Sequence, residues 1–239
     1  MTAATRLIVV AIALGCFLHA ACTSDESAGH VQRSSVDTTT RFAFDAEPTG
    51  RPPAGWRVEA TRSGVGGEGA GLARWSVVAD ASAPSAPSVL ALTASTHGEQ
   101  DTFNLCWTDR VTFRDGRLRV AVKAAGGEID RGGGLIWRVQ GQDDYYICRY
   151  NPLEKNFRVY RVVGGVRHQL DSELAELAPG GWHVIEVVID GSRITCTLDG
   201  AARLEAEDDA LPQAGGVGVW TKADAVTSFD ELSIDGQGR

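Results

Sequence analysis

The sequence predicts an all-β protein built as an antiparallel sandwich of two sheets. From residue 41 onward, short runs of alternating apolar and polar residues follow one another, which is the pattern of strands with one buried face. Turns rich in glycine and aspartate separate the runs, among them the Asp-Gly pairs at 190–191 and 199–200, and Asp-Gly favours hairpins because its turn requires positive φ. Helical periodicity is confined to Ser172–Ala178, where one or two turns are expected. Many short strands of this kind predict one sandwich domain.

The predicted strands follow one another along the whole of this domain. In chain order they are 42–45, 88–92, 116–124, 134–140, 145–150, 156–163, 166–170, 183–189, 193–198, 215–221 and 227–234.

The first residues are typical of an export signal. Arg6 precedes the apolar run Leu7–Leu18 and a small-residue end, which is the order of a signal peptide. The run is shorter than the roughly 20 apolar residues that span a bilayer. The stretch LHAAC resembles a bacterial lipoprotein signal and predicts a lipid on Cys22, with plain cleavage near Ala21 as the alternative.

This N-terminus defines the predicted organisation and location. Residues 1–21 are expected to be a signal peptide, 22–40 a polar linker too poor in apolar residues to form a core, and 41–239 the sandwich domain. The protein is therefore expected in the bacterial periplasm or cell envelope, attached to the membrane only through its lipid.

Charge and cysteine content exclude several classes of function. The net charge is −8, whereas nucleic acid is bound by basic surfaces. Cys106, Cys148 and Cys196 are widely spaced and match no metal-ligand pattern, and cysteines inside strands usually behave as small buried apolar residues. No histidine pair or nucleophile motif is present. The prediction is therefore no nucleic acid, no catalytic metal and no cofactor.

Strand parity places arginine and tyrosine on one outward face. In 134–140, Leu135, Trp137 and Val139 are expected in the core, which turns Arg138 outward. The same reasoning sends four side chains of the next two strands outward: Tyr145, Arg149, Arg158 and Tyr160.

If neighbouring strands align, Arg138, Arg149 and Arg158 form a ladder across three strands. Like charges opposite one another destabilise a sheet, so the ladder requires carboxylates or a ligand. Two interpretations are open. One is a structural ion-pair lattice, and the other is a ligand surface on which guanidinium groups bind sugar hydroxyls or uronate carboxylates. The carboxylates available to the lattice are Asp143, Asp144, Glu154 and Glu186.

The segment after the strand 215–221 is a second candidate region. Lys222 and Asp224 lie in a loop, and loops at the ends of a sandwich often carry function. Asp45 or Asp230 is a candidate for rim calcium, although no dense Asp/Asn ligand run of EF-hand type is present.

Several motifs together resemble a known superfamily. The order FAFD, GGGLIWR, YYICRYNP and the closing FDEL is similar to the laminin-G-like members of the concanavalin A-like lectin and glucanase superfamily. It is nearest the exported bacterial 3-keto-disaccharide hydrolase-like domain family, over residues 42–234. The resemblance implies a jelly-roll sandwich whose concave sheet often meets carbohydrate. Members include hydrolases, lectins and structural modules, so the fold alone does not select among them.

The catalytic patterns of these relatives match only in part. Glu128–Asp130 resembles the start of the glucanase motif, but the second glutamate is missing, and the glycines that follow predict a solvated loop. The keto-disaccharide hydrolase-like pattern matches at Arg138. Its glutamate and glutamine correspond to Tyr146 and Cys148, so the catalytic residues stay unassigned.

The leading functional prediction is a carbohydrate-binding, lectin-like protein of the cell envelope. Its ligand-binding residues would be Arg138, Tyr145, Arg149, Arg158, Tyr160, Lys222 and Asp224. A glycoside hydrolase or lyase acting on a keto-disaccharide or glucan is the second hypothesis. A structural or partner-binding envelope domain is the third.

Overall fold

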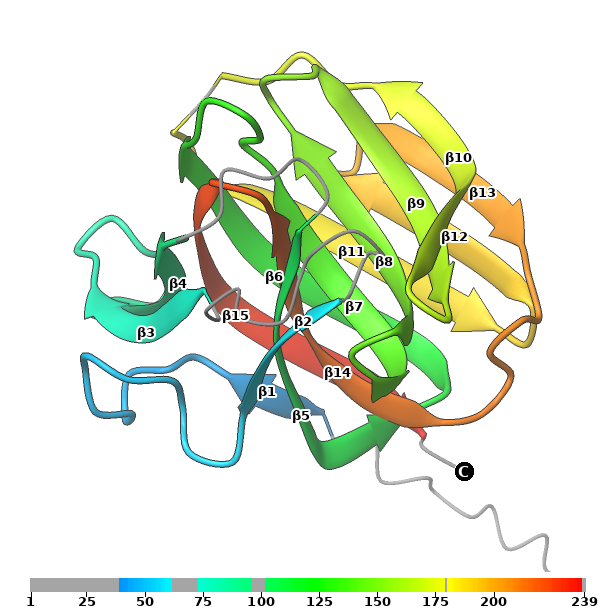
Figure 1. Cartoon of the computed structure of the whole chain (residues 1–239), viewed down its shortest axis with the longest axis horizontal. Coiled ribbons are helices and arrows are strands. Elements are labelled where there is room, and N and C mark those ends of the chain that lie inside the picture. Colours follow the sequence, from blue (N-terminus) through cyan, green and yellow to red (C-terminus); the bar gives the residue numbers. More distant parts are fainter. Residues whose placement is uncertain (1–38, 62–72, 96–101, 179, 238–239) are drawn as a thin grey trace, which may run out of the picture. The chain divides into compact units, whose positions relative to one another are not determined.

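The computed structural model describes residues 39–61, 73–95, 102–178 and 180–237. In these residues the chain forms fifteen β-strands in two antiparallel sheets, so the predicted all-β sandwich is confirmed (Figure 1). No membrane-spanning helix is found among them. The predicted signal peptide and Cys22 lie outside the described residues, as does most of the predicted linker.

Eight strands form sheet A: β1 (Thr40–Phe42), β3 (Arg74–Ala79), β4 (Ser88–Ala94), β6 (Asp115–Gly126), β11 (His183–Asp190), β12 (Arg193–Leu198), β13 (Ala202–Glu207) and β15 (Val226–Gln237). Their spatial order is β13-β12-β11-β6-β15-β4-β3, and β1 pairs with β15.

Seven strands form sheet B: β2 (Arg57–Thr61), β5 (Phe103–Phe113), β7 (Gly133–Gly141), β8 (Asp144–Asn151), β9 (Asn156–Val163), β10 (Val166–Leu174) and β14 (Gly215–Lys222). Their spatial order is β10-β9-β8-β7-β14-β5-β2. In Figure 1 the meander β7 to β10 lies in front of sheet A.

One hydrophobic core lies between the two sheets. Leu135, Trp137 and Tyr146 of sheet B belong to it together with Val120 and Val187 of sheet A. Alternation of side chains along each strand produces this arrangement, because every second residue of a strand points to the same face. The parity predicted for the strands β8 and β9 is therefore confirmed.

The three cysteines of the domain are buried free thiols, as predicted. Burial raises the pKa of the Cys148 thiol of sheet B, and the neighbouring Cys196 thiol of sheet A raises it further.

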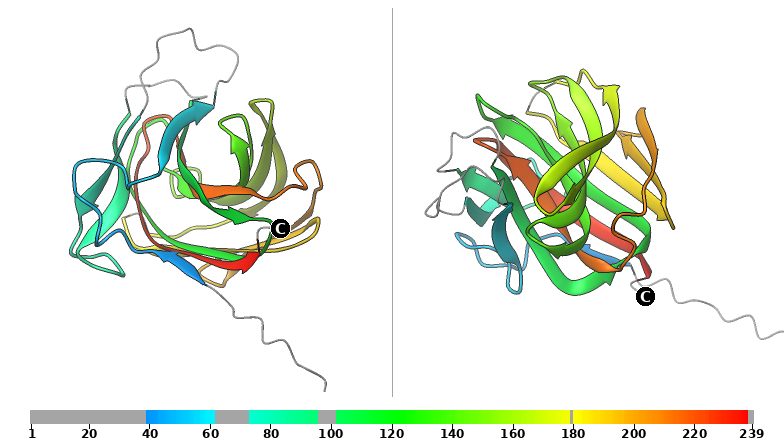
Figure 2. Two further views of the ribbon diagram at one scale, coloured as in Figure 1. Left: turned by 90° about the horizontal axis from the view of Figure 1, so that it is seen from below. Right: turned by 45° about the vertical axis from the view of Figure 1, so that its right-hand side comes forward.

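Sheet B curls strongly around the face that is turned away from sheet A. The guanidinium carbon of Arg167 in β10 lies 4.7 Å from the ring centre of Phe103 in β5, although five strand-to-strand steps separate β10 from β5. Adjacent strands are about 4.8 Å apart, so a flat sheet would hold these two about 24 Å apart. The hydroxyl groups of Thr61 in β2 and Tyr145 in β8 are likewise hydrogen-bonded at 2.5 Å. We call this inward-curling face the concave face (Figure 2).

The concave face carries a second hydrophobic cluster. Its members are Phe103, Leu105, Trp107, Ile136, Val139, Tyr145, Ile147, Val162 and Trp220. They come from five of the seven strands, and the curl of the sheet brings them together.

A β-bulge overturns the predicted position of Arg138. Between Ile136 and Val139, β7 has one residue more than its partner β14 has between Gly218 and Gly216, and Arg138 adopts φ 48°. The extra residue reverses the alternation, so Val139 lies on the concave face and Arg138 points into the sandwich.

Arg138 is consequently bound by its surroundings at the end of the sandwich. Its guanidinium donates to the backbone carbonyls of Arg114, Gly191 and Leu211, at 2.8–3.1 Å, and to the Asp115 carboxylate at 3.1 Å. Its exposed fraction is 2%. Arg138 is therefore a structural residue, away from the other two arginines of the predicted ladder.

The predicted helix at Ser172–Ala178 is also wrong. Residues up to Leu174 continue β10, and the backbone N–H of Ala175 donates to the carbonyl of Lys155. Pairing with β9 across this edge, from Ser172 opposite Arg158 to Leu174 opposite Asn156, outweighs the local helix propensity.

We expect Arg138→Met to lower the free energy of unfolding by about 3 kcal/mol, because three backbone carbonyls and a carboxylate lose the donor that this buried side chain supplies. Arg117→Met removes an exposed arginine paired with Glu186 and should cost less than about 0.5 kcal/mol. Urea unfolding of both variants measures the difference. Equal costs would contradict a structural role for Arg138.

Candidate functional site

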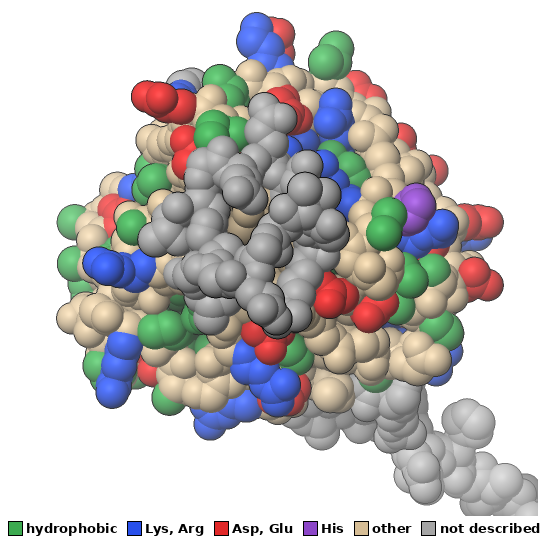
Figure 3. Space-filling model, viewed as in Figure 1, with side chains coloured by type: hydrophobic (Ala, Val, Ile, Leu, Met, Phe, Trp, Pro, Cys, Tyr) green, Lys and Arg blue, Asp and Glu red, His purple; other side chains and the backbone are tan. Residues whose placement is uncertain are grey.

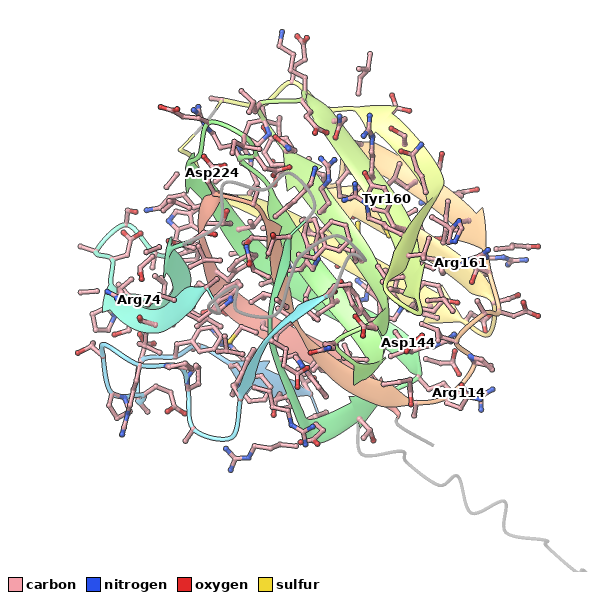
Figure 4. All side chains as sticks on the ribbon, viewed as in Figure 1. Arg74, Arg114, Asp144, Tyr160, Arg161 and Asp224 are labelled. Atoms are coloured by element: carbon pink, nitrogen blue, oxygen red, sulfur yellow. The ribbon has the colours of Figure 1, made fainter. Side chains whose placement is uncertain are left out.

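Ionisable side chains gather at one end of the concave face and act on one another electrostatically. This polar cluster consists of Asp130, Arg149, Glu154, Tyr160, Arg167 and Lys222. The residues come from the β6–β7 loop, β8, the β8–β9 turn, β9, β10 and the end of β14. Tyr160 and Asp224 mark this end of the molecule in Figure 4, whereas Asp144 and Arg114 lie toward the other end.

Arg149 and Arg158 face each other directly across β8 and β9, as the predicted ladder requires. Glu154 lies between them. Its carboxylate accepts from Arg149 at 2.8 Å and is ion-paired with Arg158 at 3.5 Å. Burial alone would raise the pKa of Glu154, but the charge of Arg149 and the hydrogen bonds it receives lower it to about 2. The repulsion between the two arginines is thus offset by one shared carboxylate.

Arg149 is held firmly in this position. Its guanidinium donates to the side-chain oxygen of Asn156 at 2.5 Å and to the Tyr160 hydroxyl at 3.1 Å. Its exposed fraction is 2%. Burial would lower the pKa of Arg149, but Tyr160, Glu154 and Asp130 outweigh it and raise the pKa. Arg149 therefore stays charged inside the cluster.

Glycine allows β7 to approach Arg149 closely. Gly134 lies opposite Arg149 on one side and opposite Trp220 on the other. A Cβ at Gly134 would lie 1.9 Å from the carbonyl oxygen of Cys148 and 2.6 Å from the Cα of Arg149. Only glycine fits there, so no side chain stands between Arg149 and Trp220 in this row of the sheet.

Asp224 holds the loop that carries Asp130. Its carboxylate accepts from the backbone N–H groups of Glu128, Ile129 and Asp130, at 2.7–3.2 Å. Burial opposes the ionised form, but these backbone hydrogen bonds lower the pKa of Asp224. Asp224, which the sequence predicts to bind ligand, thus fixes the position of the loop that carries Asp130.

Asp130 is buried, although the sequence predicts a solvated loop. Its exposed fraction is 1%, and burial raises its pKa against the opposing effects of Arg149, Gly132 and Lys222. Within the described part of the chain, the one hydrogen bond to its carboxyl comes from the Gly132 N–H, at 2.8 Å. This carboxyl therefore has capacity to accept further donors.

The aromatic floor of the cluster lies beside these polar groups. Trp220 is fully buried and packs against Phe103, with ring centres 5.4 Å apart. Tyr145, a predicted ligand residue, is also fully buried, and burial raises the pKa of its hydroxyl, which is bonded to Thr61. Tyr145 therefore forms part of the floor below the polar groups.

Among the predicted ligand residues, the structure brings together Arg149, Arg158, Tyr160 and Lys222 and separates Arg138 from them. Sequence reasoning missed Asp130 and Arg167. The glycines after Asp130 were a usable signal, because they allow the close approach that buries this loop. Nothing in the alternation of β10 distinguishes Arg167 from a solvent-facing arginine.

The predicted calcium candidates lie apart from the polar cluster. Asp45 accepts from the Ser85 hydroxyl and the Ser88 N–H, at 2.9 and 3.0 Å, and Asp230 accepts from the Ser85 N–H at 2.7 Å. The two aspartates thus anchor one segment before β4. In the residues that the structure describes, no group of three or more His, Cys, Asp or Glu side chains is arranged to hold a metal.

Comparisons with known proteins agree with this architecture. The family model of the 3-keto-alpha-glucoside-1,2-lyase-like domain matches residues 45–234. The carbohydrate-binding module CBM66 of Bacillus subtilis superposes with a TM-score of 0.55 at 13% identity, over 75% of this chain and 94% of that chain. A β-glucanase of Bacillus licheniformis gives 0.55 at 12% identity, over 84% and 99% of the two chains.

A Bacillus subtilis protein with a galectin-like fold also superposes, with a TM-score of 0.51 at 12% identity, over 77% of this chain and 90% of that chain. At these identities the structures establish a shared jelly-roll fold and no more. No curated protein matches the chain.

Asp230 makes the stability of the fold depend on pH, and the direction of this dependence follows from the pKa of its carboxyl. Burial raises that pKa from 3.8 to about 6, against hydrogen bonds from the N–H groups of Ser85 and Glu231. The folded protein therefore holds this proton more tightly than the unfolded chain does. The protonated Asp230 carboxyl therefore makes its whole contribution to the free energy of unfolding below about pH 4, and this contribution is lost as the pH rises to about 6.

We therefore expect wild type to lose about 2 kcal/mol relative to Asp230→Asn between about pH 4 and about pH 7. Urea unfolding across this range measures it, and parallel profiles would contradict it. A bound calcium ion would lower the pKa of Asp230 and flatten the profile, so the measurement is made with and without calcium.

Proposed function

Because the chain belongs to the 3-keto-alpha-glucoside-1,2-lyase-like domain family, we propose that it binds carbohydrate at the polar cluster of the concave face. One observation carries the proposal: Asp130 is a buried carboxyl with unused capacity to accept hydrogen bonds. Buried polar groups are normally satisfied, and sugar hydroxyls are suitable donors for a carboxylate.

The surroundings of Asp130 support the same ligand class. A sugar ring has polar edges and apolar C–H faces. The cluster offers charged groups, among them Arg149 and Lys222, beside the aromatic side chains of Tyr160 and Trp220. Ligand sites in proteins commonly combine an apolar surface with a few placed polar groups.

We expect Asp130→Asn to weaken glycan binding at least about tenfold, because hydrogen bonds to a charged acceptor contribute about 1.5–3 kcal/mol. The matched control is Glu186→Gln, which changes a carboxylate on the outer face of sheet A that is paired with Arg117. Calorimetry with glycans, including keto-disaccharides, measures both.

A thermal-shift screen first identifies the glycan. A ligand at one hundred times its dissociation constant adds about 2.7 kcal/mol, which corresponds to about 5–10 °C for a domain of this size. Equal affinity of the two variants would place the site elsewhere. Absence of binding across the panel would overturn the carbohydrate proposal.

Asp130 also favours a second candidate, an elimination reaction on a 3-keto-glycoside. The ketone makes the hydrogen at C2 acidic. Asp130 would take that proton as the C1–O bond breaks, leaving a C1=C2 double bond and an aglycone that receives a proton as it departs. A carboxylate with a raised pKa is a stronger base near neutral pH, and Arg149 or Lys222 would stabilise the developing enolate.

Product analysis separates the two candidates. An enzyme would release the aglycone and a conjugated enone that absorbs ultraviolet light, and Asp130→Asn would abolish both. A binding module would leave the sugar intact.

We further propose that the protein is exported and attached to the membrane through a lipid on Cys22. Cys22→Ser should then move the full chain from the membrane fraction to the soluble fraction of the envelope. Mass spectrometry of the mature N-terminus checks this directly. A mature chain with an unmodified Cys22 would support plain cleavage near Ala21.

A further inference from the structure

Arg167 is a half-buried arginine whose Nη1 atom is buried and lacks a hydrogen-bond acceptor among the described residues. Its guanidinium carbon lies 4.7 Å from the ring centre of Phe103 and 4.6 Å from that of Tyr160, so it is positioned over two aromatic rings. Its Nη1 atom is buried and has no hydrogen-bond partner in the part of the chain that the structure describes. In that same part, no carboxylate lies within ion-pair distance of Arg167.

Such an arrangement is unfavourable unless something else binds the guanidinium. Burial lowers the pKa of Arg167, and an unsatisfied buried donor loses its hydration without compensation. The rings of Phe103 and Tyr160 recover part of this cost through cation–π attraction. They do not satisfy the buried Nη1 group, which requires an acceptor.

The polar cluster has an excess of positive charge. It contains three cations, Arg149, Arg167 and Lys222, and two carboxylates, Asp130 and Glu154. Three minus two leaves a net charge of +1, within a chain whose net charge is −8.

On the surface, by contrast, Figure 3 shows basic and acidic side chains interspersed over the visible described face. The positive excess is therefore a property of the cluster. A positive site on an acidic protein selects anionic ligands.

We propose that the ligand of this site is an acidic sugar, whose carboxylate, sulfate or phosphate group accepts hydrogen bonds from Arg167. This inference rests on the carbohydrate-binding function proposed above. A guanidinium fork matches the geometry of a planar carboxylate or a phosphate. The hydroxyl groups of the same sugar would donate to Asp130, so that one molecule binds both Asp130 and Arg167.

Calorimetry tests the inference with four matched sugars: glucose, glucuronate, glucose 6-sulfate and glucose 6-phosphate. We expect at least one anionic sugar to bind wild type about tenfold or more tightly than glucose, because charge-assisted hydrogen bonds are about twice as strong as neutral ones. The ranking of the anions identifies the charged group. Acetate is the control for a carboxylate without a sugar.

Two substitutions assign the preference to Arg167. Arg167→Met keeps the apolar stem and removes the charge, so binding of the anionic sugar should fall to the level of glucose. Arg167→Lys keeps the charge without the fork and should retain part of the preference. Arg203→Met, an exposed arginine of sheet A paired with Glu205, should bind like wild type.

Stability of the ligand-free variant gives an independent readout. Removing a half-buried charge with an unsatisfied Nη1 group should leave the melting temperature of Arg167→Met unchanged or higher. If Arg167→Met does not fold, Arg167 supports the fold and the inference is overturned.

The outcomes separate this inference from the proposed function. Glucose bound as tightly as the anionic sugars would overturn the acidic-sugar inference and leave carbohydrate binding intact. No binding of any sugar would overturn both. Retention of the preference in Arg167→Met would overturn the assignment of Arg167.

Discussion

Charged and aromatic side chains can share the concave face because sheet B curls far enough to remove that face from water. The contact between β10 and β5 through Arg167 and Phe103 excludes a flat sheet, and strand twist supplies the curvature. In a flat sheet the same residues would be solvated, and their ion pairs would contribute little. Because the curl removes these side chains from water, their charges must be compensated by neighbouring groups.

That compensation differs along the face. Arg149 and Arg158 share Glu154, so this part of the predicted ladder behaves as the ion-pair lattice. Among the described residues, the Asp130 carboxyl has one hydrogen bond, from the Gly132 N–H, and the Nη1 atom of Arg167 has none. The ion-pair interpretation left open by the sequence therefore applies to Arg149 and Arg158, whereas the ligand-surface interpretation stays a proposal that rests on Asp130 and Arg167.

Alternation predicted the sandwich, most of its strands and the faces of β8 and β9, because a strand buried on one side imposes a period of two. It did not predict β2, β3, β5 and β13. Alternation failed in β7, where one extra residue reversed the faces of Arg138 and Val139. No residue type in that strand predicts a bulge. The prediction also failed at Ser172–Ala178, where pairing with β9 decided the backbone. The burial of Asp130 and the partial burial of Arg167 depend on contacts between segments distant in the chain, and local sequence patterns do not contain that information.

The hydrogen bonds from Asp224 have a consequence for exchanging loops between related domains. This carboxylate, in the β14–β15 turn, binds three consecutive backbone N–H groups of a loop 94–96 residues earlier in the chain. An insertion in either segment would pull the other out of register and move Asp130. The two loops therefore form one transplantable module, and a graft that carries only the β6–β7 loop would deliver its carboxyl to the wrong place.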